Sequence, residues 1–257
     1  SESDLDEEAT HLYPTADETE AVYHAIEREI LSRMPEHKVQ PSIERVQLAM
    51  NILGDPQNLY RSVHLTGTNG KTSTARMISA LLRASGRKVG RFTSPHLTTM
   101  RERISVNDEP ISQAQFVAAY EDVAPYLAMV DEHSKRSGGP AMSFFEVLTV
   151  MMLAAFADVP VDAAVIEVGM GGKWDATNVI NADVAVITPI AHDHEKWLGS
   201  TLAEIATEKA GIIKPGSFVI SAKQTPQVLE ILRDRANEVG AVLRVVGEDL
   251  HLVSSQL

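Results

Sequence analysis

The chain has 257 residues, of which 44% are hydrophobic, so it can fill one large folded core or two small ones. Its formal net charge is -12, from 35 acidic and 23 basic side chains, and without a basic block we expect no binding to nucleic acid. It contains no cysteine, which excludes disulfides, thiolate metal ligands and cysteine nucleophiles and fits a reducing, cytoplasmic location.

The N-terminal region is acidic, and we expect a solvated, disordered tail over residues 1–16. Asp17 and Glu20 have the spacing of a helix start, and an amphipathic helix is predicted to follow them. A second amphipathic helix is predicted from Ser42 to Gly54. These two helices form an N-terminal helical segment that precedes the rest of the fold.

Short apolar runs alternate with helical ones from Ser62 onward, which is typical of βαβ units. The runs lack polar alternation, as expected of parallel strands covered by helices on both faces. An apolar run at Val147–Ala157 is too short to span a bilayer and is predicted to be a buried helix, so we expect no membrane association. We predict one α/β domain over residues 17–257, with a mostly parallel sheet whose strands are Val63–Leu65, Val89–Phe92, Ala163–Val168, Ala182–Ile187, Phe218–Ile220 and Val242–Val246.

A glycine-containing loop lies between the first predicted strand and the next helix. Gly67 and Gly70 allow a tight turn that directs successive amide N–H groups at an anion, and the helix N-terminus adds its positive dipole end. Lys71 can then reach the terminal phosphates of a nucleotide. Leu65 replaces the first glycine of the longer general motif, so the alternative is a plain turn with a solvated lysine. The predicted nucleotide-binding residues are Gly67, Thr68, Asn69, Gly70, Lys71 and Thr72.

Two candidate metal ligands follow neighbouring strands. Glu167 lies near the carboxyl end of a strand buried on both faces, where it needs a cation, a proton or a ring of donors, and Mg²⁺ is the natural partner beside a nucleotide. His194 follows the next strand at the same edge of the sheet and is a second candidate, although Mg²⁺ prefers oxygen ligands. The alternatives are a glutamate turned to solvent and an ordinary hydrogen-bonded loop.

Together these motifs resemble the folylpolyglutamate synthase and dihydrofolate synthase family, within the larger group of Mur-type ligases, from about Val39 onward. The phosphate loop is shared by Mur ligases, and the remaining motifs look like the folate branch. The resemblance implies a P-loop NTPase-like Mur ligase central domain. Besides the loop, it is carried by Thr93-Ser94-Pro95-His96-Leu97, Glu102-Arg103-Ile104, Phe145-Glu146-Val147-Leu148-Thr149, Glu167-Val168-Gly169-Met170-Gly171-Gly172, Trp174-Asp175-Ala176-Thr177-Asn178, Asp193-His194 and Glu208-Lys209-Ala210-Gly211.

The resemblance also implies a role for individual residues. Residues 68–71 would hold the phosphates of ATP, and Ser94, Glu167 and His194 would bind Mg²⁺. Lys209 would carry CO₂ as a carbamate, N6-carboxylysine, whereas its position alone predicts only a helix-end lysine favoured by the dipole. The implied catalytic residues are Lys71, Lys209 and His194.

Three segments are implied to contact a pterin-bearing substrate. For the second of them a structural role is the alternative, since Ser143 and Glu146 have the spacing of a capping box and the two phenylalanines between them can belong to the core. The implied substrate-binding residues are Val39, Gln40, Pro41, Ser143, Phe144, Phe145, Glu146, Trp174, Asp175 and Ala176.

The activity that the resemblance implies is an ATP-dependent ligase, acting as a monomer, that adds L-glutamate to tetrahydrofolate, to dihydropteroate or to both through an acyl phosphate. The C-terminal domain of the family is expected to be absent from this chain. Three alternatives stay open: a peptidoglycan Mur-type amino-acid ligase, an ATP-binding module that is inactive without the C-terminal domain, and a small-molecule P-loop kinase.

Overall fold

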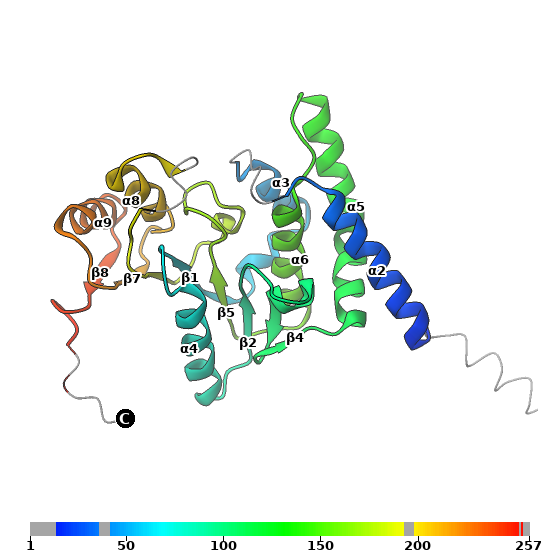
Figure 1. Ribbon diagram of the computed structural model, residues 1–257, viewed down its shortest axis with the longest axis horizontal. Helices are drawn as coiled ribbons and strands as arrows, with labels where there is room; N and C mark the ends of the chain where they lie inside the picture. Colours follow the sequence, from blue (N-terminus) through cyan, green and yellow to red (C-terminus); the bar gives the residue numbers. More distant parts are fainter. Residues whose placement is uncertain (1–13, 36–41, 193–197, 252, 254–257) are drawn as a thin grey trace, which may run out of the picture.

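The fold is built on one eight-stranded sheet, seen in a computed structural model that describes residues 14–35, 42–192, 198–251 and 253 (Figure 1). The strand order is β4-β3-β2-β5-β1-β6-β7-β8. All neighbouring strands from β2 to β8 pair in parallel, while β3 and β4 add an antiparallel edge. The strands are β1 (Arg61–Thr66), β2 (Val89–Phe92), β3 (Ile104–Val106), β4 (Glu109–Pro110), β5 (Ala163–Glu167), β6 (Val184–Ile187), β7 (Phe218–Ser221) and β8 (Val242–Val245).

The helices follow the strands in the alternating order that βαβ units require. Three short 3₁₀ helices, η2 (Pro56–Asn58), η3 (Met100–Arg103) and η4 (Ala176–Val179), lie in the connections. The α-helices are α2 (Ala16–Ser32), α3 (Glu44–Ile52), α4 (Lys71–Ala84), α5 (Gln113–Arg136), α6 (Phe144–Asp158), α8 (Leu202–Ala210) and α9 (Pro226–Val239).

The predicted mostly parallel α/β architecture is confirmed, and each of the six predicted strands is present. The prediction missed β3 and β4, which contain only three and two residues. Their connection is a two-residue turn in which Asn107 and Asp108 both have positive φ, at 51° and 67°. That conformation matches the twist of an antiparallel hairpin, so the Asn-Asp pair was the local signal for it.

Helices lie on both faces of the sheet, as predicted. On one face α4 packs Ala75 against Leu65 of β1 and Val165 of β5. On the other face α6 covers the middle of the sheet, while α8 and α9 cover Ala185 of β6 and Val219 of β7 (Figure 1). The helices cover the sheet unevenly. On the α4 face they leave apolar side chains of β7 and β8 exposed to solvent.

These exposed side chains form a row across the sheet. The parallel register aligns Val63, Val184, Phe218 and Val242 on β1, β6, β7 and β8. Val63 and Val184 are half-buried beside α4, whereas Phe218 is 55% and Val242 38% exposed. The layer on this face therefore ends before the sheet does.

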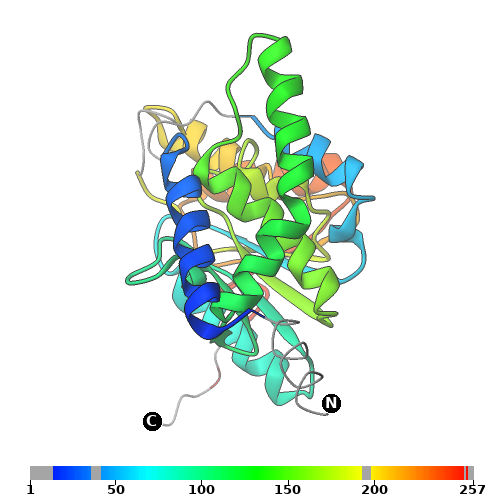
Figure 2. The same ribbon diagram turned by 90° about the vertical axis from the view of Figure 1, so that its right-hand side faces the viewer.

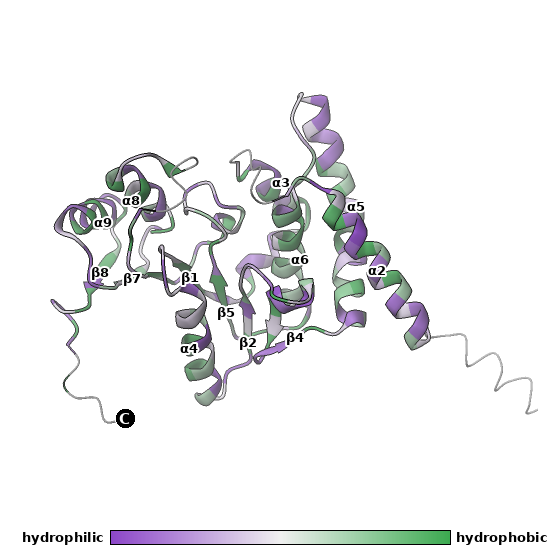
Figure 3. Cartoon of the chain, viewed as in Figure 1, coloured by the Kyte–Doolittle hydropathy of each residue, from purple (hydrophilic) through white to green (hydrophobic). Residues whose placement is uncertain are grey.

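Helix α6 is the centre of the core, and every residue from Phe144 to Phe156 is buried. It is coloured as strongly apolar along its length in Figure 3. Helices α2, α3 and α5 pack around it on the side away from the sheet, and Figure 2 shows α2 and α5 crossing in front. The predicted buried helix at Val147–Ala157 is thus confirmed. Among the described residues, no helix is long and apolar enough to cross a membrane.

The first helix begins earlier than predicted. Thr15 is its N-cap and Glu18 completes the capping box, so Ala16 is already helical and Asp17 lies inside the first turn. The pairs Thr15/Glu18 and Asp17/Glu20 both have capping-box spacing. The structure uses the first pair, in which the hydroxyl of Thr15 is the acceptor. Residues 1–13 of the predicted tail lie outside the described residues. The second predicted helix is confirmed within two residues at each end, as α3.

A buried ion pair joins the N-terminal segment to α6. Arg45 of α3 donates through Nε to both carboxylate oxygens of Glu146, at 2.9 and 3.2 Å, and the two side chains are only 13% and 6% exposed. The same carboxylate accepts from the backbone N–H of Ser143 at 2.7 Å. Because two charges are satisfied together, removing one alone leaves the other buried without its partner.

We therefore expect Arg45→Met to lower the free energy of unfolding by about 3–5 kcal/mol, since it leaves the Glu146 carboxylate buried without a cationic partner. The double variant Arg45→Met/Glu146→Gln keeps an acceptor for Ser143 but removes the charge, and should recover much of that loss. Chemical denaturation of both variants checks this. A double variant no more stable than the single one would contradict it.

Candidate functional site

The predicted loop residues meet at the carboxyl edge of the sheet. Strand β1 lies between β5 and β6, and its loop leads directly into α4 at Lys71. Open α/β sheets bind ligands at such an edge. A cavity of about 430 Å³ lies there, and it is lined by Thr68, Asn69, Gly70, Lys71, Thr72, Ser73, Ser94, Pro95, Glu167 and Gly169.

Two glycines give the loop its shape. Gly67 has φ 145°, and a Cβ atom on it would lie 1.8 Å from Oγ1 of Thr188 at the end of β6. Only glycine permits this approach between the loop and the neighbouring strand. Gly70 is the N-cap of α4 with φ 84°, and open space surrounds it, so its requirement is conformational.

The segment after β6 holds the loop in place. Thr68 donates its backbone N–H to the carbonyl of Pro189 at 3.0 Å. Its hydroxyl donates to the carbonyl of Ala191 at 3.0 Å and accepts from the Ala191 N–H at 2.9 Å. Thr68 therefore orients the loop as well as lining the cavity. The segment leads towards the predicted ligand His194, which lies outside the described residues.

Two lysines share one acceptor in the loop. Lys71 Nζ donates to the carbonyl oxygen of Gly67 at 2.8 Å, and Lys209 Nζ donates to the same oxygen at 3.1 Å. Lys209 is only 2% exposed, although it lies in the last turn of α8. The predicted catalytic lysines are thus brought together at the phosphate loop, a contact that the helix-end position of Lys209 did not indicate.

Glu167 is buried beside the start of α4. In the parallel register it pairs with Leu65, on the face that α4 covers. Its carboxylate accepts from the hydroxyl of Thr72, at 3.1 and 2.9 Å, and is only 2% exposed. Burial raises its pKa to about 6, while the Thr72 hydroxyl, Lys71, the backbone N–H of Ser94 and Arg76 oppose the rise. The predicted alternative of a glutamate turned to solvent is therefore wrong.

The cavity offers oxygen donors suited to a hard cation. Glu167 supplies a carboxylate, Thr72 a hydroxyl next to it, and Ser94 lines the same space. Within the described part of the chain, no group of three or more acidic, histidine or cysteine side chains is arranged so that it could hold a metal ion. A set of few protein ligands fits Mg²⁺ beside a nucleotide, because this ion retains water and phosphate oxygens in its coordination shell.

The predicted substrate residues on α6 have clear structural roles. Ser143 and Glu146 form the capping box of the helix, and all four residues from 143 to 146 are buried. Phe145 packs against Phe92 and against Gly169, where a Cβ atom would lie 2.5 Å from its ring. Since Gly169 also lines the cavity, the start of α6 adjoins the nucleotide-binding edge. The role of these residues in substrate binding stays a prediction, and Val39, Gln40 and Pro41 lie outside the described residues.

The third predicted substrate segment, residues 174–176, is a tight loop that leads into η4. Asp175 accepts from the N–H groups of Met170 at 2.9 Å and Thr177 at 3.0 Å, and burial raises the pKa of its carboxyl. Ala176 is also buried, whereas Trp174 is 48% exposed. Asp175 therefore shapes the loop, as the Asp-x-Thr spacing of an N-cap indicates, and Trp174 is its accessible side chain.

Sequence reasoning missed several residues that shape the site. Thr188 limits the space at Gly67, and Arg76 lies one helical turn after Thr72 on the side of Glu167. The i, i+4 spacing of Thr72 and Arg76 was a usable signal, because both project from one face of α4. Thr188 and Glu208 contact residues that are distant in the sequence, and such contacts have no local signature.

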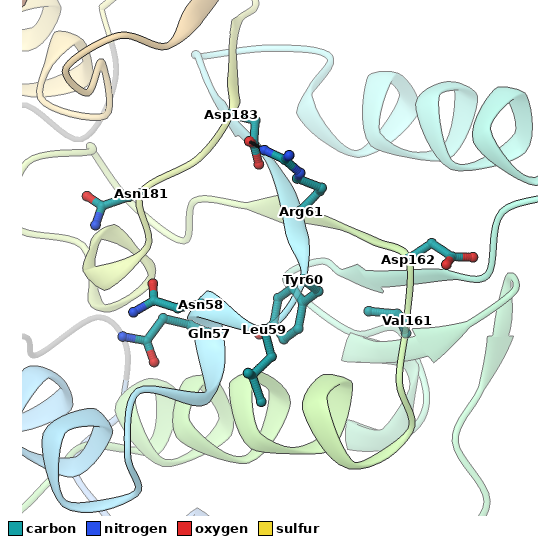
Figure 4. A pocket seen from close by; sticks show the side chains of 9 residues that line it. All are labelled: Gln57, Asn58, Leu59, Tyr60, Arg61, Val161, Asp162, Asn181 and Asp183. Atoms are coloured by element: carbon teal, nitrogen blue, oxygen red, sulfur yellow. Dashed lines mark hydrogen bonds and ion pairs between the residues drawn. The ribbon is translucent and has the colours of Figure 1, made fainter.

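A second hollow, of about 530 Å³, lies at the opposite edge of the sheet (Figure 4). It is found where β1, β5 and β6 begin, and Arg61 points across it to Asp183 at 2.5 Å. None of the predicted site residues lines it. The chemistry predicted from the sequence therefore belongs to the carboxyl edge.

Comparison with known proteins agrees with the fold. Residues 65–245 match the model of the Mur ligase middle domain. A dihydrofolate synthase/folylpolyglutamate synthase of Mycobacterium tuberculosis is 51% identical over 250 residues, covering 94% of this chain and 51% of the relative. The enzyme of the same name from Bacillus subtilis is 40% identical over 204 residues, covering 79% of this chain and 46% of the relative. The chain thus spans about half the length of these curated relatives.

Solved structures show the same likeness. Mycobacterium tuberculosis folylpolyglutamate synthase complexed with ADP superposes with a TM-score of 0.84 at 49% identity, over 90% of this chain and 51% of that one. The folylpolyglutamate synthase of Thermotoga maritima gives a TM-score of 0.80 at 36% identity, with the same coverage of 90% and 51%. The predicted resemblance to the folate branch is confirmed. Because the middle-domain match covers more than half of its residues, this chain belongs to the Mur ligase family.

Proposed function

We propose that this chain is the ATP-binding part of an acid–amino-acid ligase that adds L-glutamate to tetrahydrofolate, to dihydropteroate or to both. The observation that carries the proposal is the single cavity in which the phosphate loop, Ser94 and the buried Glu167 meet. The names of the relatives, folylpolyglutamate synthase and dihydrofolate synthase, supply the substrate class.

ATP is proposed to bind with its phosphates on the loop. The backbone N–H groups of residues 69–71 offer donors to an anion, and the N-terminus of α4 offers the positive end of a helix dipole. Lys71 now donates to the neutral carbonyl of Gly67. A phosphate oxygen is a better acceptor, because its negative charge adds Coulomb attraction to the hydrogen bond of the ammonium group. When the nucleotide binds, Lys71 therefore releases the Gly67 carbonyl and donates to a phosphate oxygen instead.

Mg²⁺ is proposed to bind through Glu167 and the hydroxyl groups of Thr72 and Ser94, with His194 as the further ligand that the family resemblance implies. The raised pKa of Glu167 reflects a carboxylate that burial leaves short of positive charge. A cation at this position would supply the missing positive charge to the Glu167 carboxylate. When bound, Mg²⁺ supplies positive charge to the phosphate oxygens as the phosphoryl group moves.

Lys209 is proposed to carry a carbamate. Its ammonium group and that of Lys71 donate to one carbonyl oxygen, so two like charges are held close together at a buried position. The Lys209 ammonium first loses one proton, and the neutral amine then adds to CO₂ and loses a second proton, so that a positive charge is replaced by a negative one and this repulsion is relieved. The anion also becomes a possible neighbour of the cation at Glu167.

The proposed reaction transfers the γ-phosphoryl group of ATP to a carboxylate of the folate substrate, which gives an acyl phosphate and ADP. The amino group of L-glutamate then displaces phosphate and forms the amide. The protein contributes positioning and electrostatic stabilisation, through the loop N–H groups and Lys71, because phosphoryl transfer requires little covalent chemistry from the enzyme. Trp174 and the start of α6 are proposed to receive the pterin ring. A monomeric, cytoplasmic enzyme remains our expectation.

Changing Lys71 to Ala removes the cation from the loop. We expect the affinity for ADP to fall by about 10- to 100-fold, the equivalent of one hydrogen bond to a charged group, while the fold is retained. Isothermal titration calorimetry measures the affinity, and circular dichroism measures the fold. Lys135→Ala, at an exposed lysine in the last turn of α5, is the control and should bind as the parent does. Equal affinities in all three proteins would refute the loop assignment.

The substrate class is tested by turnover of a protein that contains this chain. We expect ADP release that requires L-glutamate together with tetrahydrofolate or dihydropteroate. ADP release with a UDP-linked peptidoglycan precursor instead would identify a different Mur ligase. Phosphate transfer to a stable small-molecule acceptor would identify a kinase, and nucleotide binding without any turnover would identify a binding module.

The protonation of Glu167 gives a further prediction for the ligand-free protein. A pKa raised from 4.5 to about 6 means that ionisation of Glu167 lowers the free energy of unfolding. This loss of stability develops as the pH rises from below 4.5 through about 6. Glu167→Gln removes the titration. The unfolding free energy of the variant minus that of the parent should therefore increase by about 2 kcal/mol between pH 4 and pH 7.5. Denaturation at both pH values measures it, and a difference that does not change with pH would contradict the buried, ionisable state.

A further inference from the structure

The loop that carries Trp174 contacts the carboxyl end of α8 through Glu208, and Asn178 Nδ2 adds a bridge between the carbonyls of Lys173 and Gly211, at 3.1 and 3.2 Å. The carbonyl oxygen of Glu208 accepts from the backbone N–H of Lys173 at 2.9 Å. Its side-chain Oε1 accepts from the backbone N–H of Trp174 at 3.0 Å. Glu208 thus binds two consecutive residues of the loop, one through its backbone and one through its side chain.

Glycines allow the loop and the helix to pack backbone against backbone. A Cβ atom on Gly172 would lie 2.8 Å from the Glu208 carbonyl oxygen and 2.9 Å from that of Lys209. A Cβ atom on Gly211 would lie 2.5 Å from Cβ of Lys173. These contacts place Gly172 and Lys173, two residues and one residue before Trp174, directly against the end of α8.

The same two elements also contact the phosphate loop. Lys209, the residue after Glu208, donates to the Gly67 carbonyl at 3.1 Å. At the start of the Trp174 loop, the hydroxyl of Thr66 donates to the carbonyl of Gly171 at 2.6 Å. Consecutive residues of α8 therefore hold two different loops, one that binds phosphate and one that presents an exposed tryptophan.

We propose that Glu208 is a positioning residue that couples the phosphate loop to the loop bearing Trp174, an inference that rests on the proposed function. Nucleotide binding draws Lys71 from Gly67 and alters the place of Lys209 on the same oxygen. The end of α8 responds, and the Glu208 carboxylate transmits the change to the backbone of Trp174. The occupied nucleotide site thereby sets the orientation of the tryptophan.

The side chain carries this role, because its Oε1 atom is the acceptor of the Trp174 N–H, whereas the bond to the Glu208 carbonyl holds only Lys173 and persists in any variant. Glu208→Ala removes the acceptor for Trp174. Glu208→Gln retains an amide oxygen at the same position and should rescue the function. Glu204→Ala is the matched control on α8, since it removes the capping-box carboxylate at the other end of the helix without a contact to the Trp174 loop.

The test uses the emission of Trp174 in a Trp197→Phe background, which leaves one tryptophan in the chain. The proteins are titrated with AMPPCP, a non-hydrolysable ATP analogue, and Mg²⁺, and its affinity is measured separately by calorimetry. We expect the analogue to shift Trp174 emission in the parent, in Glu208→Gln and in Glu204→Ala. In Glu208→Ala the shift should be lost, while the affinity stays within about threefold of the parent, less than a typical coupling factor.

The outcomes separate the two proposals. Absence of calorimetric binding to the parent would contradict ATP binding itself. Binding that leaves the emission of the parent unchanged, or a shift that survives in Glu208→Ala, would overturn the coupling role of Glu208 while leaving ATP binding intact. Loss of the shift in Glu204→Ala as well would mean that general weakening of α8 is the cause, which also overturns it.

Discussion

The close approach of Gly67 to the end of β6 is the constraint on which the rest of the site depends. Because glycine has no side chain, the backbone of the loop can press against Thr188, and its carbonyl oxygen becomes the common acceptor of Lys71 and Lys209. The next residue, Thr68, is bound to the segment after β6. Three elements distant in sequence are thereby fixed around one peptide unit.

The site combines this rigidity with a local electrostatic imbalance. Glu167 is held by the Thr72 hydroxyl in a buried position, where its ionised form is disfavoured despite Lys71 and Arg76 nearby. The contact of α4 with β1 and β5, through the buried residues Ala75, Leu65 and Val165, holds it in this position. Such an arrangement is typical of a functional site, in which a group is kept ready for a ligand at a cost in stability that the fold elsewhere offsets.

Much of the fold was predictable because it is encoded locally. Parallel strands are continuous apolar runs, and the phosphate loop has its glycines and lysine at fixed spacing, so both were found from the sequence. Strands of two and three residues, such as β4 and β3, give no periodic signal. The helix start was misplaced because two capping-box pairs overlap within residues 15–20, and the geometry of Thr15 selects one of them. The contacts of Glu208 with residues 34 or more positions away arise only from tertiary packing.

The incomplete helical layer over β7 and β8 affects the surface properties of the folded chain. Phe218 and Val242 stand side by side in the aligned row, and both are in contact with solvent. An apolar face of this kind adsorbs hydrophobic dyes and surfaces even when the protein is fully folded. Since sulfate and phosphate strengthen the burial of apolar area, we expect them to favour contacts through this face. Two strands at the edge of the sheet thus contribute to how the folded chain responds to concentrated salt.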